Sequence, residues 1–455
     1  MNFDHAYNFF MIPNGPTPLE LLKHLPRIQK DPVGYLAWSA NNYGDLVKYR
    51  AGTVDAFLVN HPDSARLILR DHHNQYNKDT IQYNALARVT GKGLLTNSGE
   101  HWLKQRRIIQ PAFARQRLAV IEPYAIQACQ SAIRRWMALP KENRVIDVDR
   151  EMMYLSLEVL GLGLFGSDLG DQLKPLVEAV LVGLDYIMSG ARNPLRLPTF
   201  FPTQRNRRFL NALKTLDEAV EGMLNRRKQL GLGDDLLSIL IRAQEEQGKE
   251  TLPDRQIRDE VVTLLIAGHE TVATALTWSW YLLSQNPEQR QQLFSEVDSV
   301  LNGNAPGLDI LQELTYTFNV FQEALRLYPP AWLITRKALQ PDDLSGYTIP
   351  ADALVIISPY TMHRHPDFWQ LPERFDPNRF SAERFNHQHK FAYIPFGGGP
   401  ALCIGKNFAL IEAQIVLASL SQVFQFDLAK QEPVQMDALV TLRPRGGLHM
   451  RLTER

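Results

Sequence analysis

Residues 396–405 read FGGGPALCIG, three glycines and a proline that lead to Cys403. Only one other cysteine, Cys129, occurs in the 455 residues. Glycine lets the backbone approach a large flat ligand more closely than side chains would permit. The apolar pattern after Cys403 predicts a helix over 405–423, and the N–H groups at a helix start stabilise a thiolate. We therefore expect Cys403 to be a thiolate that is presented to a ligand.

A thiolate in this position suits the axial ligand of a haem iron, to which it donates electron density that favours O–O cleavage. The alternative for a lone cysteine is a buried structural thiol. Cys129 lies within the helical pattern AIQACQSAIRRW and fits that alternative. Cys403, between flexible glycines and a helix, fits the role of ligand better.

Composition excludes several classes of function. Lys plus Arg equals Asp plus Glu, so the formal net charge is zero and gives no support for nucleic-acid or membrane binding. Two cysteines make no disulfide framework. The N-terminus lacks the pattern of a signal peptide, and no apolar run approaches the ~18 residues of a membrane span. We expect a cytoplasmic protein without a membrane anchor.

Helical periodicity dominates the chain, with short strand-like stretches near both ends. Helices are predicted at 117–137, 149–165, 171–188, 206–230, 255–285, 287–301, 312–328 and 405–423. Strands are predicted in LVKYRAG, AFLVN, GYTIP, ALVIISPY and TLRPRGGLHMRL. No linker divides the chain, so we expect one mainly α domain with small β-sheets (α+β) over 1–455, with the fold proper at about 30–452.

Three short motifs suggest other functions, and their contexts argue against them. GLGLFG at 161–166 follows a helical pattern, whereas a dinucleotide fingerprint needs a preceding strand; a helix end with a glycine cap explains it better. HETVA lacks the second histidine of a zinc helix, because that position is Ala273. GGGPALCIGKN has five residues between Gly399 and Gly405, where a phosphate-binding loop has four.

Five motifs resemble those of the cytochromes P-450, the haem-thiolate monooxygenases. The family's signature F-x-x-G-x-R-x-C-x-G is matched at Phe396, Gly399, Cys403 and Gly405. The other four are HWLKQR with Trp102 and Arg106, AGHET at 267–271, EALR with Glu323 and Arg326, and FDPNRF with Arg379. They occur in the family's order and spacing, so the resemblance covers nearly the whole chain. Each motif alone is unspecific, and the five together are specific.

The resemblance implies haem b (iron protoporphyrin IX) held between a distal helix at about 255–285 and the cysteine loop and proximal helix at 396–423. Cys403 is then the axial ligand of the iron. The other residues expected to hold the haem are Trp102, Arg106, Ala267, Gly268, Arg336, Phe396, Gly397 and Gly405. Glu270 and Thr271 are expected to be catalytic, as an acid–alcohol pair that delivers protons to dioxygen. The alternative for Thr271 is a hydroxyl bonded to its own helix.

Glu323, Arg326 and Arg379 are expected to be structural, because a buried carboxylate needs charged partners. Arg374 is a rival for the second arginine. Ala401 departs from the family pattern, where this position is usually an Arg or His that donates to a haem propionate. The remaining propionate anchors are then Trp102, Arg106 and Arg336.

The function implied is hydroxylation or epoxidation of a small apolar molecule, such as a fatty acid, lipid or terpenoid, with dioxygen. No flavin or nicotinamide motif is present, so two electrons must come from a partner such as ferredoxin or flavodoxin with its reductase. Recognition is expected in 74–95 and 180–210, and at Val262, Leu265, Ile266, Ala331, Trp332, Leu333, Leu439 and Val440. For any one of these residues, a place in the core is the alternative. We expect a soluble bacterial type of enzyme that is a monomer.

A basic surface for the partner is expected at Lys104, Arg107, Arg115, Arg117 and Lys406, and an ordinary solvated surface is the alternative. Two other functions stay open. One is a peroxide-driven or isomerising haem-thiolate enzyme, and the other is a haem-binding sensor without turnover. The pair Glu270–Thr271 argues against both, since neither needs ordered proton delivery.

Overall fold

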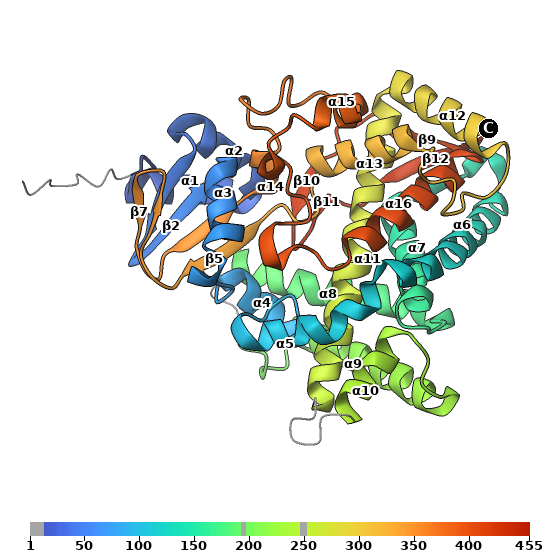
Figure 1. The fold of residues 1–455 in the computed structure, drawn as a ribbon, viewed down its shortest axis with the longest axis horizontal. Helices are drawn as coiled ribbons and strands as arrows, with labels where there is room; N and C mark the ends of the chain where they lie inside the picture. The colour runs from blue at the N-terminus through green and yellow to red at the C-terminus, as the bar shows by residue number, and fades with distance from the viewer. Residues whose placement is uncertain (1–12, 193–196, 246–252) are drawn as a thin grey trace, which may run out of the picture. The chain divides into compact units, whose positions relative to one another are not determined.

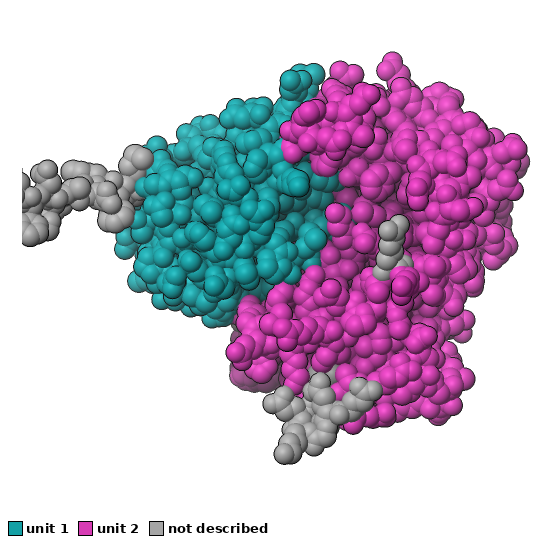
Figure 2. Space-filling view, in the orientation of Figure 1, with its two compact units in different colours: residues 1–80, 333–372, 389–402 teal, residues 81–332, 373–388, 403–455 magenta. Residues whose placement is uncertain are grey.

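The computed structural model describes residues 13–192, 197–245 and 253–455 (Figure 1). The chain forms two compact units, which Figure 2 shows in different colours. Unit 1 comprises residues 1–80, 333–372 and 389–402, and unit 2 comprises 81–332, 373–388 and 403–455. The expectation of a single domain over 1–455 stays a prediction.

Unit 1 is built on a five-stranded sheet with the order β1-β2-β8-β5-β3. Its strands are β1 (Leu46–Ala51), β2 (Val54–Val59), β3 (Tyr76–Asn77), β5 (Ile334–Ala338) and β8 (Leu354–Ile357). β2 and β8 are parallel, and the other neighbours are antiparallel. A separate hairpin pairs β6 (Asp342–Leu344) with β7 (Tyr347–Ile349). The helices of unit 1 are α1 (Pro18–Lys30), α2 (Pro32–Tyr43), α3 (Pro62–Arg66) and α14 (Pro359–Met362).

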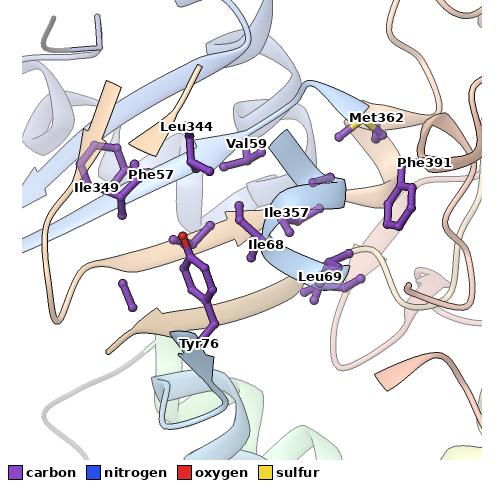
Figure 3. Packing of buried hydrophobic residues seen from close by; sticks show 14 of the residues in the cluster. Phe57, Val59, Ile68, Leu69, Tyr76, Leu344, Ile349, Ile357, Met362 and Phe391 are labelled. Carbon is purple, nitrogen blue, oxygen red and sulfur yellow. The ribbon is translucent and has the colours of Figure 1, made fainter. Parts of the chain in front are cut away.

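The core of unit 1 lies where this sheet meets the helical turns that follow β2 (Figure 3). Phe57 and Val59 are two residues apart in β2, so both point to one face of the sheet. Ile68, Leu69 and Phe391 come from segments outside the sheet and belong to the same buried cluster. Burial of these apolar side chains is the main stabilising contribution in this unit.

Unit 2 is mainly helical and contains two small sheets. Its helices are α4 (Ile81–Thr90), α5 (Gly99–Ile109), α6 (Ile121–Met137), α7 (Val148–Gly163), α8 (Leu173–Arg192), α9 (Gln204–Leu230), α10 (Leu236–Glu245), α11 (Asp254–Gln285), α12 (Pro287–Leu301), α13 (Thr315–Leu327), α15 (Ala382–Phe385) and α16 (Lys406–Ser421). Its strands are β4 (Val145–Asp147), β9 (Phe424–Leu428), β10 (Met436–Ala438), β11 (Leu442–Pro444) and β12 (His449–Glu454), paired in the orders β4-β12-β9 and β10-β11.

The central helix of unit 2 is α11, which packs against α7, α9, α13 and α16. A helix that is apolar on all sides is typical of a protein core. Among the described residues, α11 alone is long and apolar enough to cross a membrane, and 83% of its most apolar window is buried inside the protein. The helix is therefore explained as a core element.

The predicted helices are confirmed, with shifts at their ends, as α6, α7, α8, α9, α11, α12, α13 and α16. The five predicted strand segments overlap β1, β2, β7, β8, β11 and β12. The explanation of GLGLFG as a helix end is confirmed, because α7 ends at Gly163. The expected glycine cap is wrong, since the C-cap is Leu164 and the left-handed Gly166, with a φ of 57°, follows two residues later.

Candidate active site

One side of α11 is accessible within an otherwise buried helix. Between Asp259 and Trp280, every residue of α11 is buried except Ala267, Gly268 and Thr271. Ala267 and Thr271 are one turn apart, so they lie on the same face of the helix. The accessible surface is thus small and carries the residues that were predicted to face the cofactor and dioxygen.

The hydroxyl of Thr271 is hydrogen-bonded within its own helix. Its Oγ1 donates to the carbonyl oxygen of Ala267 at 2.8 Å. This is the bond that the alternative interpretation of Thr271 predicts. The hydroxyl oxygen keeps lone pairs that can accept a hydrogen bond from a ligand. Thr271 therefore offers a fixed acceptor on the accessible face of α11.

Gly268 allows α11 and α7 to pack closely. A Cβ built on Gly268 would lie 2.9 Å from Cδ1 of Leu160 in α7, closer than real side chains come. The sequence had suggested that this glycine makes room for the haem and dioxygen. The neighbour that a side chain at this position would meet in the structure is Leu160 of α7, and a role toward the haem stays a prediction.

Glu270 precedes Thr271 in α11 and is buried. Oγ1 of Thr441 donates a hydrogen bond to its Oε1 at 2.8 Å. Burial raises the pKa of Glu270 to about 7, although the charge of Arg443 and the bond from Thr441 oppose the shift. Both protonation states are therefore accessible near neutral pH, as a general acid or base requires.

Cys403 is exposed and lies just before α16. Gly405 is the N-cap of α16, and no side chain among the described residues caps this helix end. Although the residue is exposed, the protein atoms around its sulfur disfavour the charged thiolate and raise the pKa of the Cys403 thiol, while a hydrogen bond from the Gly405 backbone and the charges of Arg106 and Lys406 lower it. The net direction is upward, contrary to the expectation of a thiolate stabilised by the helix start alone. Coordination to a metal deprotonates a thiol outright.

Arg106 lies beside Cys403, as its effect on the pKa of that thiol shows. Its guanidinium carbon is 5.5 Å from the ring centroid of Trp102, one turn earlier in α5. Arg106 is half-buried and makes no salt bridge with a described residue. A partly buried cation without a carboxylate partner suits an anionic group of a ligand.

These features fit a haem group. A sulfur that a ligand can reach is the donor that haem iron takes from a cysteine. The half-buried Arg106, with Trp102, would hold a propionate. Gly405 supplies the backbone N–H beside the sulfur. The small side chain of Ala267 leaves the face of α11 beside Thr271 open.

Three further residues expected at the haem belong to unit 1. Gly397 has a left-handed φ of 72°, which favours glycine. Arg336 lies on β5, and its Nη1 donates to the carbonyl oxygen of Thr335 at 2.8 Å. The roles of Phe396, Gly397 and Arg336 at the haem stay predictions.

The glycine run is also required by packing inside unit 1. A Cβ on Gly399 would lie 1.9 Å from the carbonyl oxygen of Leu69, and one on Gly398 would lie 2.7 Å from the ring of Phe391. Gly399 also has a left-handed φ of 65°. These two glycines thus permit close approach to the protein itself, and not only to a ligand as the sequence had suggested.

The three predicted structural residues meet in unit 2. Nε and Nη2 of Arg326 donate to the two carboxylate oxygens of Glu323 at 2.6 and 2.8 Å. Nε of Arg379 donates to Oε1 of Glu323 at 3.3 Å. Of the two candidates for the second arginine, Arg379 contacts the carboxylate, and Arg374 contributes only its carbonyl oxygen, which accepts from Arg326 at 3.1 Å. Glu323 and Arg326 are completely buried.

The other cysteine matches its expected role. Cys129 lies on α6 and is buried, and burial raises its thiol pKa to about 12. A buried thiol with such a high pKa is unreactive.

The residues predicted to recognise the substrate fall into different environments. Nε1 of Trp332 donates to the carbonyl oxygen of Leu439 at 3.0 Å, which joins two of the predicted segments. Leu439 and Val440 are half-buried, and Ala331 is exposed. Val262, Leu265 and Ile266 are buried in α11. Leu333 belongs to unit 1, and residues 193–196 of the predicted region 180–210 lie outside the described residues.

The loop after α4, part of the predicted recognition region 74–95, is fixed to α11. Asp259 accepts a hydrogen bond from the backbone N–H of Lys92 at 2.8 Å, and Glu260 accepts one from that of Leu94 at 2.9 Å.

The sequence did not predict a role for either of the carboxylates Asp259 and Glu260. It also missed Thr441, which lies 171 positions from Glu270 and has no local pattern that would mark it.

Comparison with known proteins identifies the family. The model of the cytochrome P-450 family matches residues 13–450. Cyclooctatin synthase of Streptomyces melanosporofaciens is 36% identical over 410 residues, 90% of this chain and 88% of that protein. Pentalenene oxygenase of Streptomyces avermitilis is 31% identical over 450 residues, 98% of each chain. Cyclooctat-9-en-7-ol 5-monooxygenase of S. melanosporofaciens is 32% identical over 409 residues, 90% of this chain and 88% of that protein.

The chain therefore belongs to the cytochrome P-450 family. It is an oxidoreductase, a monooxygenase that uses haem b, dioxygen and an electron donor. The resemblance noted in the sequence is confirmed, as is the mainly α fold with small sheets.

Proposed function

We propose that this protein inserts one oxygen atom of dioxygen into a C–H bond of a cyclic terpenoid. The balanced reaction is R–H + O₂ + 2e⁻ + 2H⁺ → R–OH + H₂O. The observation that carries the proposal is the small accessible face of α11, which brings Ala267, Gly268 and Thr271 together. This helix packs against α16, the helix that begins directly after the cysteine loop.

Cys403 holds the haem in this proposal, with Arg106 and Trp102 on a propionate. The bound haem supplies the activation of dioxygen. Thr271 offers its hydroxyl oxygen as a hydrogen-bond acceptor on the open face of α11. Glu270, with a pKa near neutrality, holds a proton at its carboxyl and releases it toward that face.

A cyclic terpenoid is favoured by two observations. Two of the relatives are named for oxidising pentalenene and cyclooctat-9-en-7-ol. The residues expected to form the pocket, such as Leu439, Val440 and Trp332, are mainly apolar, as an apolar substrate requires. A fatty acid or another lipid is the alternative substrate class.

The electrons are proposed to come from a ferredoxin or flavodoxin with its reductase, and the enzyme is proposed to be a cytoplasmic monomer. Arg107 and Lys406 are exposed, and Lys104 is half-buried. Arg117 is partly engaged by Asp234 at 3.5 Å. The exposed cations support an electrostatic docking surface for an acidic partner. The side chain of Arg115, also expected there, lies outside the described residues.

Binding of the substrate can be tested by a spectral titration. The haem-loaded protein would be titrated with pentalenene-like cyclic hydrocarbons and, in parallel, with fatty acids of similar size. A shift of the haem absorption at lower concentrations of the cyclic compounds supports the proposed substrate class. A response to fatty acids alone contradicts it.

A turnover assay distinguishes the proposed monooxygenase from the two alternative functions. With NADH, ferredoxin and its reductase under dioxygen, we expect a product that is heavier by one oxygen atom and carries ¹⁸O from labelled dioxygen. A product that forms only with added peroxide, or without any added oxidant, indicates the peroxide-driven or isomerising alternative. Ligand binding without any product indicates a sensor.

A further inference from the structure

Glu270 lies in a buried polar cluster that joins three parts of unit 2. Its neighbours are Thr441, directly before β11, Arg443 in β11, Asp149 in α7, and His269 in α11. Glu270, Thr441, Asp149 and His269 are all buried. Neither the family motifs nor the sequence patterns identified this cluster.

The hydrogen bonds in the cluster leave Glu270 with one protein donor. Oγ1 of Thr441 donates to Oε1 of Glu270 at 2.8 Å. Nη2 of Arg443 donates instead to Asp149, and the charge of Arg443 reaches Glu270 without a direct hydrogen bond among the described residues. Nδ1 of His269 donates to the carbonyl oxygen of Leu265 at 2.6 Å, so its Nε2 is an acceptor.

Three buried polar atoms in this cluster have no hydrogen-bond partner among the described residues. They are Oδ1 of Asp149, Nε of Arg443 and Nε2 of His269. Buried polar atoms in proteins are nearly always hydrogen-bonded to protein or to ordered water. A buried water typically makes about three hydrogen bonds to such groups. Arg443 and Asp149 act electrostatically on Glu270, and Arg443 also acts on His269. The three atoms therefore belong to one buried polar region, which points to bound water within it.

The cluster also leads toward the protein surface. The side chain of Asp149 is 2% exposed, that of Arg443 is 13% exposed, and those of Asp147 and Arg150 are 22% and 44% exposed. Asp147 and Arg150 both act electrostatically on Asp149. Glu270 and Asp149 are thus enclosed, whereas Arg443, beside both, and Asp147 and Arg150, at the start of α7, are partly exposed.

We propose that Thr441 is a positioning residue for Glu270, and that Arg443, Asp149 and His269 bind the water through which solvent reprotonates it. Glu270 releases its proton toward the accessible face of α11 and becomes a carboxylate. The charge of Arg443 stabilises this carboxylate, and a proton from the surface restores the acid, so the cluster is unchanged after each cycle. The inference rests on the proposed role of Glu270 as a proton donor.

The test compares Thr441→Val with Thr441→Ser in the haem-loaded enzyme. Valine has the shape of threonine without the hydroxyl, and serine keeps the hydroxyl. Thr277→Val is the matched control, because Thr277 is a buried threonine of α11 whose hydroxyl donates to the carbonyl oxygen of Ala273 in its own helix. The measured quantities are product formed per NADH consumed, peroxide released, and the solvent deuterium isotope effect on turnover.

Loss of one hydrogen bond corresponds to a roughly two- to tenfold change. We expect Thr441→Val to lower product per NADH by about this factor, with more peroxide and a larger isotope effect. Thr441→Ser should show the wild-type values of all three quantities, and Thr277→Val should change none of them. Coupling and isotope effect equal to wild type in Thr441→Val would overturn the inference.

A second readout does not depend on turnover. Infrared difference spectra between pH 5 and pH 8 should show the carboxylic acid C=O band of Glu270, absent in Glu270→Gln. Thr441→Val should shift this band, because its hydrogen bond is lost, and Asp149→Asn should slow its exchange in heavy water. An unshifted band would contradict the role of Thr441 even if the variant is unstable. If Glu270→Gln itself leaves coupling unchanged, the proposed role of Glu270 fails and not merely that of Thr441.

Discussion

Two buried carboxyl groups in unit 2 differ in how their hydrogen bonds are satisfied. Glu323 accepts two hydrogen bonds from Arg326, one from Arg379, and one from the backbone N–H of Asp376 at 2.9 Å. Glu270 accepts a single one from Thr441 among the described residues. Both have an arginine nearby, yet only at Glu323 does the guanidinium bond directly to the carboxylate.

The different hydrogen bonding of the two carboxyl groups suits two different roles, one structural and one catalytic. A carboxylate enclosed by charged donors is held ionised and fixed, which suits an anchor between α13 and the segment around Arg379. A carboxyl group that is buried with one donor has a raised pKa and can exchange its proton near pH 7. Glu323 and Glu270 are similarly buried, but they have different roles because different hydrogen-bond donors surround them.

The largest expected effect is on stability when the satisfied cluster is broken. Glu323→Gln removes the charge that compensates Arg326 and Arg379, and breaking such a buried pair costs about 3–5 kcal/mol. Denaturant unfolding of the haem-loaded protein at pH 7 measures the loss. Glu288→Gln, on the exposed start of α12, is the control and should change stability little. A loss below about 1 kcal/mol in Glu323→Gln, the range of surface ion pairs, would contradict the structural role.

A somewhat smaller effect is expected in the pH dependence of stability. The pKa of Glu270 is raised from 4.5 to about 7, so the folded state binds a proton more tightly than the unfolded state. The stabilisation from this proton is complete below pH 4.5 and is lost as pH rises through about 7. The whole loss is about 3 kcal/mol, since each pKa unit corresponds to ~1.4 kcal/mol. Unfolding at pH 5 and pH 8 should show this decline in the wild type and a flatter profile in Glu270→Gln; parallel profiles would contradict it.

The smallest of these effects concerns the accessible face of α11. Thr271→Ala removes the hydroxyl but keeps the haem site, so the protein should still consume NADH while it releases more peroxide. We expect product per NADH to fall about tenfold, less than the ~10²–10⁴-fold that a lost proton-transfer group costs, because the hydroxyl accepts a hydrogen bond and is not itself the acid. Ser279→Ala is the control, because its hydroxyl also bonds to its own helix but at a buried position. Equal coupling in Thr271→Ala and wild type would show that the hydroxyl has no part in oxygen activation.

The sequence predicted the parts of the molecule that have a local pattern. The long apolar helices such as α11, and Cys403 before α16, have such patterns. α1 was missed because none of its residues is buried. Its start is defined instead by a capping box between Thr17 and Glu20, a weaker pattern than a buried apolar stripe.

Contacts between distant segments were predicted only where the family resemblance supplied them. The meeting of Glu323 with Arg379 is an example. The bond between Thr441 and Glu270, and the packing of Gly268 on Leu160, have no counterpart in local spacing. Such contacts depend on tertiary packing, which brings together residues far apart in the chain.

Replacing Cys403 by His tests most directly whether this thiol is the ligand of the haem iron. The reduced carbon monoxide complex of the wild type should absorb at the long-wavelength position that a thiolate ligand produces, because the thiolate donates electron density to the iron. Cys403→His should move the band to the short-wavelength position of an imidazole ligand, and Cys129→Ala should leave it in place. A Cys403→His protein that binds haem and keeps the long-wavelength band would contradict the assignment.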